Sequence, residues 1–246
     1  MPDLLPALGP WLICALAAAV GCALQRLAGQ GFGMVAAPVL ALAAPEFLPG
    51  TVLLTGLAVG AGSFVADRSA VVTRDLPPGF AGRMLGAVIA AWIAARVVGT
   101  PALPLVVGGV VWLGVILSVA GLRLGPAPRV LFGAGTVAGV MGTLTGIGAP
   151  PMAIVYADVE ARRSAATQNV FFAFGMAVSI AALTVAGLIG LRHVAFAATL
   201  LPVIGATLWL VRPWAVRVAR GRIRPWALGL AATAATVLIA RSLIGP

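Results

Sequence analysis

Charged residues are scarce in this sequence: they make up 9% of its 246 residues, and lysine is absent altogether. A soluble domain carries about 25% charged residues, so the composition excludes a soluble protein. Hydrophobic residues account for 61% of the chain, and the mean hydropathy is +1.11. Apolar stretches of membrane-spanning length recur throughout. We therefore predict an all-α, polytopic integral membrane protein surrounded by lipid bilayer.

Residues that bind metals or act as nucleophiles are also few. His193 is the only histidine, so no metal-ligand spacing exists, and we interpret it as a polar residue at a helix end. Cys14 and Cys22 share one predicted helix about 12 Å apart, too far for a disulfide, and are interpreted as packing residues. The sequence has no HExxH motif, no Walker motif, and no nucleophile–base or paired-carboxylate arrangement at membrane depth. We predict a non-enzyme with no metal and no cofactor.

Acidic residues number six, and all of them stand at segment ends or in loops. Cation sites and proton relays in membranes usually need a carboxylate within a helix. This scarcity disfavours a metal-cation or sodium pump. If protons drive transport, the candidates for coupling are Glu46, Asp158 and Glu160.

The net charge of +10 comes entirely from arginines. They cluster at the ends of apolar stretches, where arginine anchors a membrane protein and sets its orientation, so no nucleic-acid partner is predicted. Arg83 stands about one turn inside its segment, and we expect it to be interfacial like the others.

A glycine pattern occurs twice within apolar sequence. The first copy is Gly29-Gln30-Gly31-Phe32-Gly33, and the second is Gly146-Ile147-Gly148-Ala149, followed by Pro150 and Pro151. Broken helices are tolerated at membrane depth only where they are buried in protein or line a cavity. Two breaks at matching places are typical of transporters whose substrate lies between two halves.

Ten apolar segments form two sets of five, and the sets share an order. Each set contains a glycine break, a short segment, one or two acidic residues after that segment, and three full-length segments. An odd number of crossings per set makes the second set inverted, so we predict inverted repeats at 1–122 and 129–246. Each repeat contains a broken half-helix or re-entrant hairpin plus full-length transmembrane helices. The predicted segments are 9–28, 31–45, 50–66, 78–99, 102–122, 129–146, 148–157, 166–190, 194–211 and 226–244.

The arginines also predict the orientation. If the loop 212–224 is cytoplasmic, eleven arginines lie on that side and three on the other. The positive-inside rule then places both termini outside, in the periplasm if the membrane is a bacterial inner membrane. The oligomeric state is left open.

The breaks also predict a binding site. A half-helix that begins in mid-membrane presents free N–H groups and the positive end of its dipole, which favour an anion. Glycine patterns also serve as packing surfaces between membrane helices, and Gly56/Gly60 and Gly142/Gly146 fit that alternative. The predicted substrate-binding residues are Arg26, Gly29, Gln30, Gly31, Gly33, Thr145, Gly146, Gly148, Ala149, Pro150, Gln168 and Asn169.

Two stretches resemble the repeat signatures of the TauE/SafE sulfite exporter family. They are LAGQGFGMVAAPVLAL, residues 27–42, and AGVMGTLTGIGAPPMAIVY, residues 138–156. The sequence departs from the family pattern at Phe32 and at Ala149–Pro150, where glycine is more frequent. The resemblance implies transport of small sulfur-containing anions, such as sulfite or organosulfonates, across the bacterial inner membrane.

Together, the residues and the resemblance predict a secondary transporter of small anions that works by alternating access. The alternatives are an anion channel, or a transporter of another small organic anion.

Overall fold

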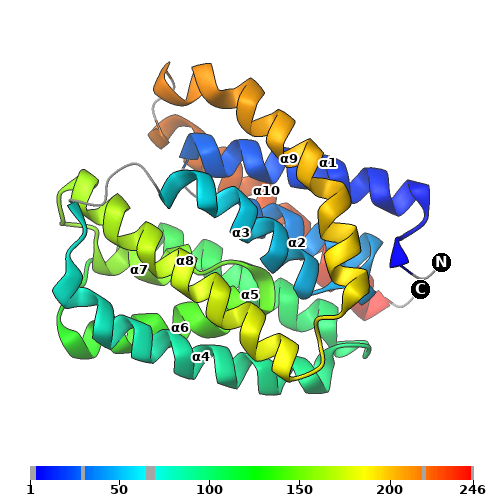
Figure 1. The fold of residues 1–246 in the computed structure, drawn as a ribbon, viewed down its shortest axis with the longest axis horizontal. Coiled ribbons are helices and arrows are strands. Elements are labelled where there is room, and N and C mark those ends of the chain that lie inside the picture. The colour runs from blue at the N-terminus through cyan, green and yellow to red at the C-terminus, as the bar shows by residue number, and fades with distance from the viewer. Residues whose placement is uncertain (1–3, 29–30, 65–69, 218–219, 245–246) are drawn as a thin grey trace.

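The computed structural model describes residues 4–28, 31–64, 70–217 and 220–244, and within these ranges it is helical with no strand (Figure 1). Six of the described helices are long and apolar enough to cross a membrane, which confirms the all-α polytopic class. The ten α-helices are α1 Leu8–Ala28, α2 Phe32–Ala43, α3 Gly50–Phe64, α4 Leu76–Val97, α5 Ala102–Val119, α6 Pro128–Thr145, α7 Ala149–Val155, α8 Ala161–Val185, α9 Leu191–Arg217 and α10 Arg220–Ile244.

The segments after the glycine breaks are short helices, as their sequences indicate. α2 has 12 residues and α7 has 7. At 1.5 Å per residue they are about 18 and 10 Å long, so neither crosses a hydrocarbon core of about 30 Å. Both are therefore half-helices.

Several predicted boundaries are wrong, the largest differences being in two places. The expected loop 212–224 is mostly helical, because α9 continues to Arg217 and α10 begins at Arg220. α8 begins at Ala161, five residues before the expected start at 166. The apolar content falls in both places, but arginine and alanine are strong helix formers and continue the helices beyond the apolar stretch.

Helices of the first set of five pack against helices of the second set, and the pairs are related in a regular way. With α1–α5 matched in order to α6–α10, the packing of α4 on α6 corresponds to that of α9 on α1. In the same way α4 on α8 corresponds to α9 on α3, and α5 on α7 to α10 on α2. Two further close pairs between the sets, α3 with α8 and α5 with α10, each join two matched helices. The division into repeats at 1–122 and 129–246 stays a prediction, and this pattern supports it.

α4 and α6 pack with their backbones in contact. Gly82 and Gly86 on α4 face Gly135 and Gly139 on α6, and both pairs have the small-xxx-small spacing that lets membrane helices approach closely. A Cβ atom added to Gly139 would lie 2.7 Å from the Cα of Gly86. Packing glycines were predicted at Gly56/Gly60 and Gly142/Gly146, and the four at this contact were missed.

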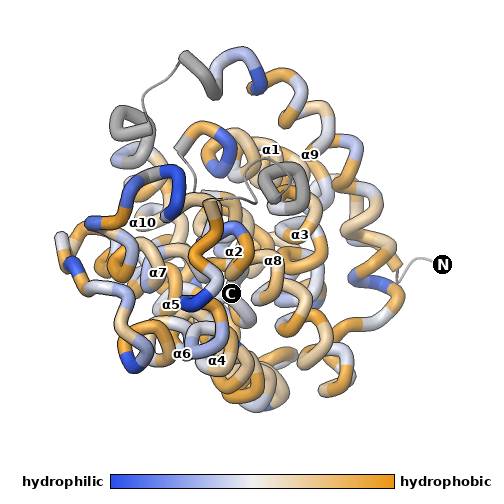
Figure 2. The backbone as a smooth tube through the Cα atoms, turned by 60° about the vertical axis from the view of Figure 1, so that its left-hand side comes forward, coloured by the Kyte–Doolittle hydropathy of each residue, from blue (hydrophilic) through white to orange (hydrophobic). Residues whose placement is uncertain are grey.

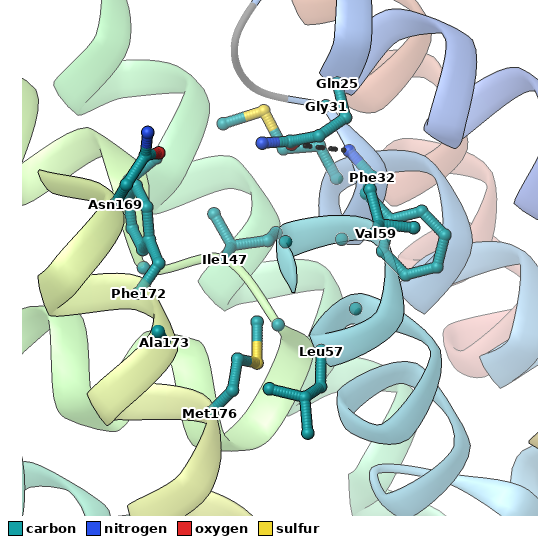
Figure 3. Close-up of a pocket in the computed structure, with 17 residues that line it drawn as sticks. Gln25, Gly31, Phe32, Leu57, Val59, Ile147, Asn169, Phe172, Ala173 and Met176 are labelled. Carbon is teal, nitrogen blue, oxygen red and sulfur yellow. Dashed lines mark hydrogen bonds between the residues drawn. The ribbon is translucent and has the colours of Figure 1, made fainter. Parts of the chain in front are cut away.

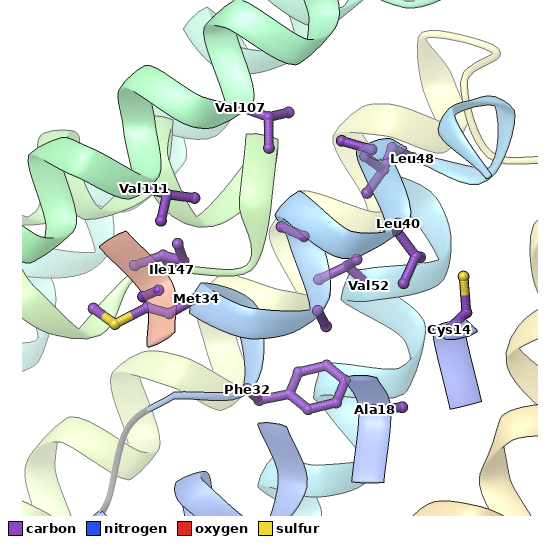
Figure 4. Packing of buried hydrophobic residues seen from close by; sticks show 14 of the residues in the cluster. Cys14, Ala18, Phe32, Met34, Leu40, Leu48, Val52, Val107, Val111 and Ile147 are labelled. Atoms are coloured by element: carbon purple, nitrogen blue, oxygen red, sulfur yellow. The ribbon is translucent and has the colours of Figure 1, made fainter. Parts of the chain in front are cut away.

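α2 lies in the core of the bundle. Nine of its residues are buried, among them Phe32, Met34 and Leu40, and it packs against α1, α5 and α10 (Figure 4). The outer helices instead expose large apolar side chains such as Val88, Trp209 and Trp226, and hydrophobic residues dominate the helices throughout (Figure 2). This distribution suits a protein whose solvent is lipid.

α1 begins and α10 ends at the same end of the bundle (Figure 1). The two ends of the described chain therefore lie near each other. That both lie outside, on the periplasmic side of a membrane, stays a prediction.

Candidate functional site

The two glycine breaks meet in the middle of the structure. Gly33, in the first turn of α2, packs on the end of α6: a Cβ atom added to it would lie 2.7 Å from the Thr145 carbonyl oxygen and 2.8 Å from the Gly146 carbonyl. The caps have backbone conformations that favour glycine, with φ of 140° at Gly31 and 75° at Gly146. Two segments from opposite halves of the chain thus touch backbone to backbone.

A pocket with a cavity volume of about 220 Å³ opens beside this contact (Figure 3). A single water molecule needs about 15 Å³ by the same measure, so the cavity has room for a small organic molecule. α3 and α8 supply two walls, through Leu57 and Val59 on α3 and Phe172 and Met176 on α8. Six predicted site residues line it: Gly31, Gly33, Gly146, Gly148, Ala149 and Asn169.

The pocket has a polar end and an apolar end. Gln25 and Asn169 lie toward one end, whereas Leu57 and Met176 lie toward the other, with Ile147 between them (Figure 3). None of the described residues that line the pocket carries a charged side chain.

Other predicted site residues lie away from the pocket lining. The Arg26 side chain is exposed, and Pro150 is buried within α7. The Thr145 hydroxyl donates to the Met141 carbonyl and accepts the Ile147 N–H, so it stabilises the break itself. The Gln168 amide donates to Ser164 Oγ at 2.8 Å. Gly29 and Gln30 lie outside the described residues.

Gln25, and not the predicted Arg26, is the polar residue of α1 that lines the pocket. Its Oε1 accepts the Phe32 N–H at 3.4 Å, at the start of α2. A helical periodicity could have found it, because Gln25 continues the buried face of α1 formed by Cys14, Ala18 and Cys22. Arg26 is one position, about 100°, further around the helix.

The position of Arg83 contradicts the prediction that it lies at the membrane interface. Its side chain is 4% exposed, in the first half of α4. Nη1 donates to the Ala138 carbonyl of α6, and Nη2 donates to Ser179 Oγ of α8 at 3.3 Å. Ser179 Oγ is in turn 2.7 Å from the hydroxyl of Thr143. The prediction failed because it judged depth by position along one segment, whereas burial depends on which neighbour the residue faces.

Three glycines make room for this guanidinium. A Cβ atom added to Gly148 would lie 3.1 Å from Arg83 Nη1, and Cβ atoms on Gly142 and Gly175 would overlap the guanidinium more severely. Gly148 also lines the pocket, so Arg83 lies directly behind the pocket wall.

α7 is a weak source of N–H donors. It has only seven residues, and Pro150 and Pro151 remove two of the N–H groups of its first turn. That the positive end of this helix holds the anion stays a prediction. The Arg83 guanidinium lies beside Gly148, the residue before α7.

The predicted coupling residues lie on the surface. Glu46 is exposed; Asp158 pairs with Arg123 at 2.6 Å, and Glu160 lies 3.6 Å from Arg163. Among the acidic residues that the structure describes, the buried one is Asp75, 4% exposed at the start of α4. Its Oδ2 accepts the hydroxyl of Tyr156, the residue after α7, at 3.0 Å.

We expect Tyr156→Phe to destabilise the protein by about 1–2 kcal/mol, because a buried carboxylate loses its hydroxyl partner. Neither residue lines the pocket, so the KM for a transported anion should not change. Thermal unfolding of the purified protein and uptake kinetics in proteoliposomes measure the two effects. An unchanged melting temperature would contradict the assignment of this bond, and a changed KM would place the pair on the substrate path.

The fold and the site define a helical membrane protein with a central pocket between two broken helices. The chain belongs to the sulfite exporter TauE/SafE family, whose sequence pattern matches residues 13–240. The predicted family is thereby confirmed, and it is one of membrane transporters of sulfur anions. No curated protein and no solved structure matches the chain.

Proposed function

We propose that the protein is a secondary transporter of small sulfur-containing anions, such as sulfite or organosulfonates, and that the pocket between the glycine breaks holds the anion. The observation that carries this proposal is the joint lining of one cavity by both breaks, with a buried guanidinium behind Gly148. The residues proposed to bind are those that line the pocket, Gln25 among them, rather than Arg26 or Gln168.

Alternating access is the proposed mechanism. The matched helices α3 and α8 form facing walls of the pocket, and each packs against the other set's helices. A shift of one set against the other would therefore change both walls at once and open the pocket toward the other side. The inverted repeat, the periplasmic termini and the bacterial inner membrane belong to this proposal.

The shape of the pocket favours an anion that carries an apolar group. A bare sulfite ion would occupy only the polar end, next to Asn169 and the glycine backbone. Leu57, Phe172 and Met176 would then face empty space or water. An organosulfonate places its anionic head at the polar end and its carbon chain against these side chains.

Uptake of labelled sulfite and labelled ethanesulfonate into proteoliposomes tests the proposal. We expect saturable uptake of at least one of them, inhibited by the other and not by acetate. Flux that rises linearly with concentration would support an anion channel. Absence of any sulfur-anion uptake by folded protein would overturn the proposed function.

Proton coupling is a separate proposal that the same vesicles address. A pH gradient should change the initial rate of uptake if protons move with the anion. Because Glu46, Asp158 and Glu160 are exposed, we propose Asp75 as a further candidate for the coupling residue.

A further inference from the structure

We propose that Arg83 makes the pocket selective for anions, acting through the wall at Gly148 without belonging to the pocket lining. The inference rests on the proposed function and adds to it the residue that supplies the charge. Arg83 is a positioning residue in this scheme, since its guanidinium acts on the substrate through the backbone of the glycine break.

Arg83 carries a buried charge that no described carboxylate neutralises. A charge within a membrane protein is costly, and it is usually paired with an opposite charge or with backbone carbonyls, of which only the opposite charge neutralises it. No carboxylate in the described part of the chain lies within 4 Å of the Arg83 guanidinium. Its described partners are a carbonyl oxygen and a hydroxyl, and its Nε has no hydrogen-bond partner among the described residues. The region behind the pocket therefore keeps a positive charge that a bound anion would balance.

This charge lies against the wall of the pocket. Nη1 lies next to Gly148, and Gly148 is part of the pocket wall. The lining itself contributes no charged side chain within the described residues, so Arg83 is the charged group that the structure places against the wall. In a site with few water molecules, a charge acts over several ångströms with little screening.

The glycines around Arg83 leave space for its guanidinium. The φ angle of Gly148 is −106°, a conformation that other residues adopt, so its backbone does not require glycine. An added Cβ atom at Gly148 would lie 3.1 Å from the guanidinium, so the two groups would have to shift by a few tenths of an ångström. Cβ atoms added to Gly142 on α6 and Gly175 on α8 would overlap the guanidinium outright, so three glycines around one charged group lack the side chains that would displace it.

A purely structural role is the competing explanation, because Arg83 also connects α4 to α6 and α8. The two roles differ in one measurable respect. A structural brace affects all ligands alike, whereas a selecting charge changes the preference between an anion and its uncharged analogue.

The test compares methanesulfonate with the uncharged methanesulfonamide as inhibitors of labelled ethanesulfonate uptake. The variants are Arg83→Met, which removes the charge, and Arg83→Lys, which keeps it. The control is Arg96→Met on the same helix, because Arg96 is exposed and contacts Trp92 away from the pocket. Binding to the detergent-purified protein, followed by thermal shift, gives a readout that does not depend on transport.

We expect Arg83→Met to weaken binding of methanesulfonate by about tenfold or more and to leave that of methanesulfonamide within about twofold. Arg83→Lys should keep the preference for the anion even if its maximal rate falls, and Arg96→Met should behave as the unmodified protein. Equal weakening of both ligands, or unchanged anion binding in Arg83→Met, would overturn the proposal.

If Arg83→Met does not fold, Arg83→Lys decides, and its loss of the anion preference would overturn the proposal. Failure of the proposed function looks different, because the unmodified protein would then show no sulfur-anion uptake at all.

Discussion

Gly33→Leu is expected to abolish transport, with a loss of at least about 100-fold in the rate of anion uptake, equivalent to about 2.7 kcal/mol. The added Cβ atom would lie 2.7 Å from the Thr145 carbonyl oxygen and 2.8 Å from the Gly146 carbonyl. Real Cβ atoms do not approach backbone this closely, so the two breaks must separate. The walls of the pocket then move apart where the anion is proposed to bind.

Gly109→Leu is the matched control for this substitution. Gly109 lies on the exposed side of α5, where an added Cβ atom meets no atom within 4 Å. Both proteins should reach the membrane, and only Gly33→Leu should fail in proteoliposome uptake of labelled ethanesulfonate and sulfite. Normal uptake by Gly33→Leu would show that contact between the breaks is not needed, and the site assignment would have to be abandoned.

Gly139→Leu is expected to have the largest effect on stability. A side chain there would meet the Arg83 carbonyl oxygen and the Gly86 Cα at 2.7 Å, and backbone atoms cannot rotate away as a flexible side chain would. Overpacking a well-packed interface costs about 1–3 kcal/mol even where side chains can adjust. Because α4 and α6 come from different halves, their separation should reduce the yield of folded protein severalfold. Size-exclusion profiles and thermal unfolding in detergent measure this loss.

Gly133→Leu provides the comparison on the same helix. Gly133 is exposed on α6, and an added Cβ atom there has nothing within 4 Å. The same leucine should therefore be harmless at a position of α6 that does not face α4. Equal yields of the two variants would be inconsistent with a backbone contact between α4 and α6.

Much of the architecture was predictable, because hydropathy and helix breakers act locally. Ten segments, the two short helices after the breaks and the irregular connection before Pro128 all follow from runs of apolar residues punctuated by glycine and proline. The family resemblance was carried by the same two glycine patterns.

The parts of the site that were missed depend on which helix faces which. The position of Arg83 near the start of its segment suggested the membrane interface. Only the packing of α4 on α6 and α8 makes it buried. The sequence does not show which helix a small-xxx-small pattern packs against. For this reason the contact between the two glycine pairs was overlooked: Gly82, Gly86, Gly135 and Gly139. Gln25 and Arg26 are neighbours in sequence, and the face that α1 turns to α2 decides between them.

The exchange of partners between the two sets has a consequence for biogenesis. When the first five helices have entered the membrane, α1 still lacks α9 and α4 still lacks α6. The glycine face of α4 stays exposed to lipid until α6 is inserted. The face of α1 that packs on α9 stays exposed until nearly the whole chain has been synthesised. The pocket therefore cannot exist on a nascent half-protein, and its assembly depends on α1 remaining in place until α8, the last helix that lines the pocket, has entered.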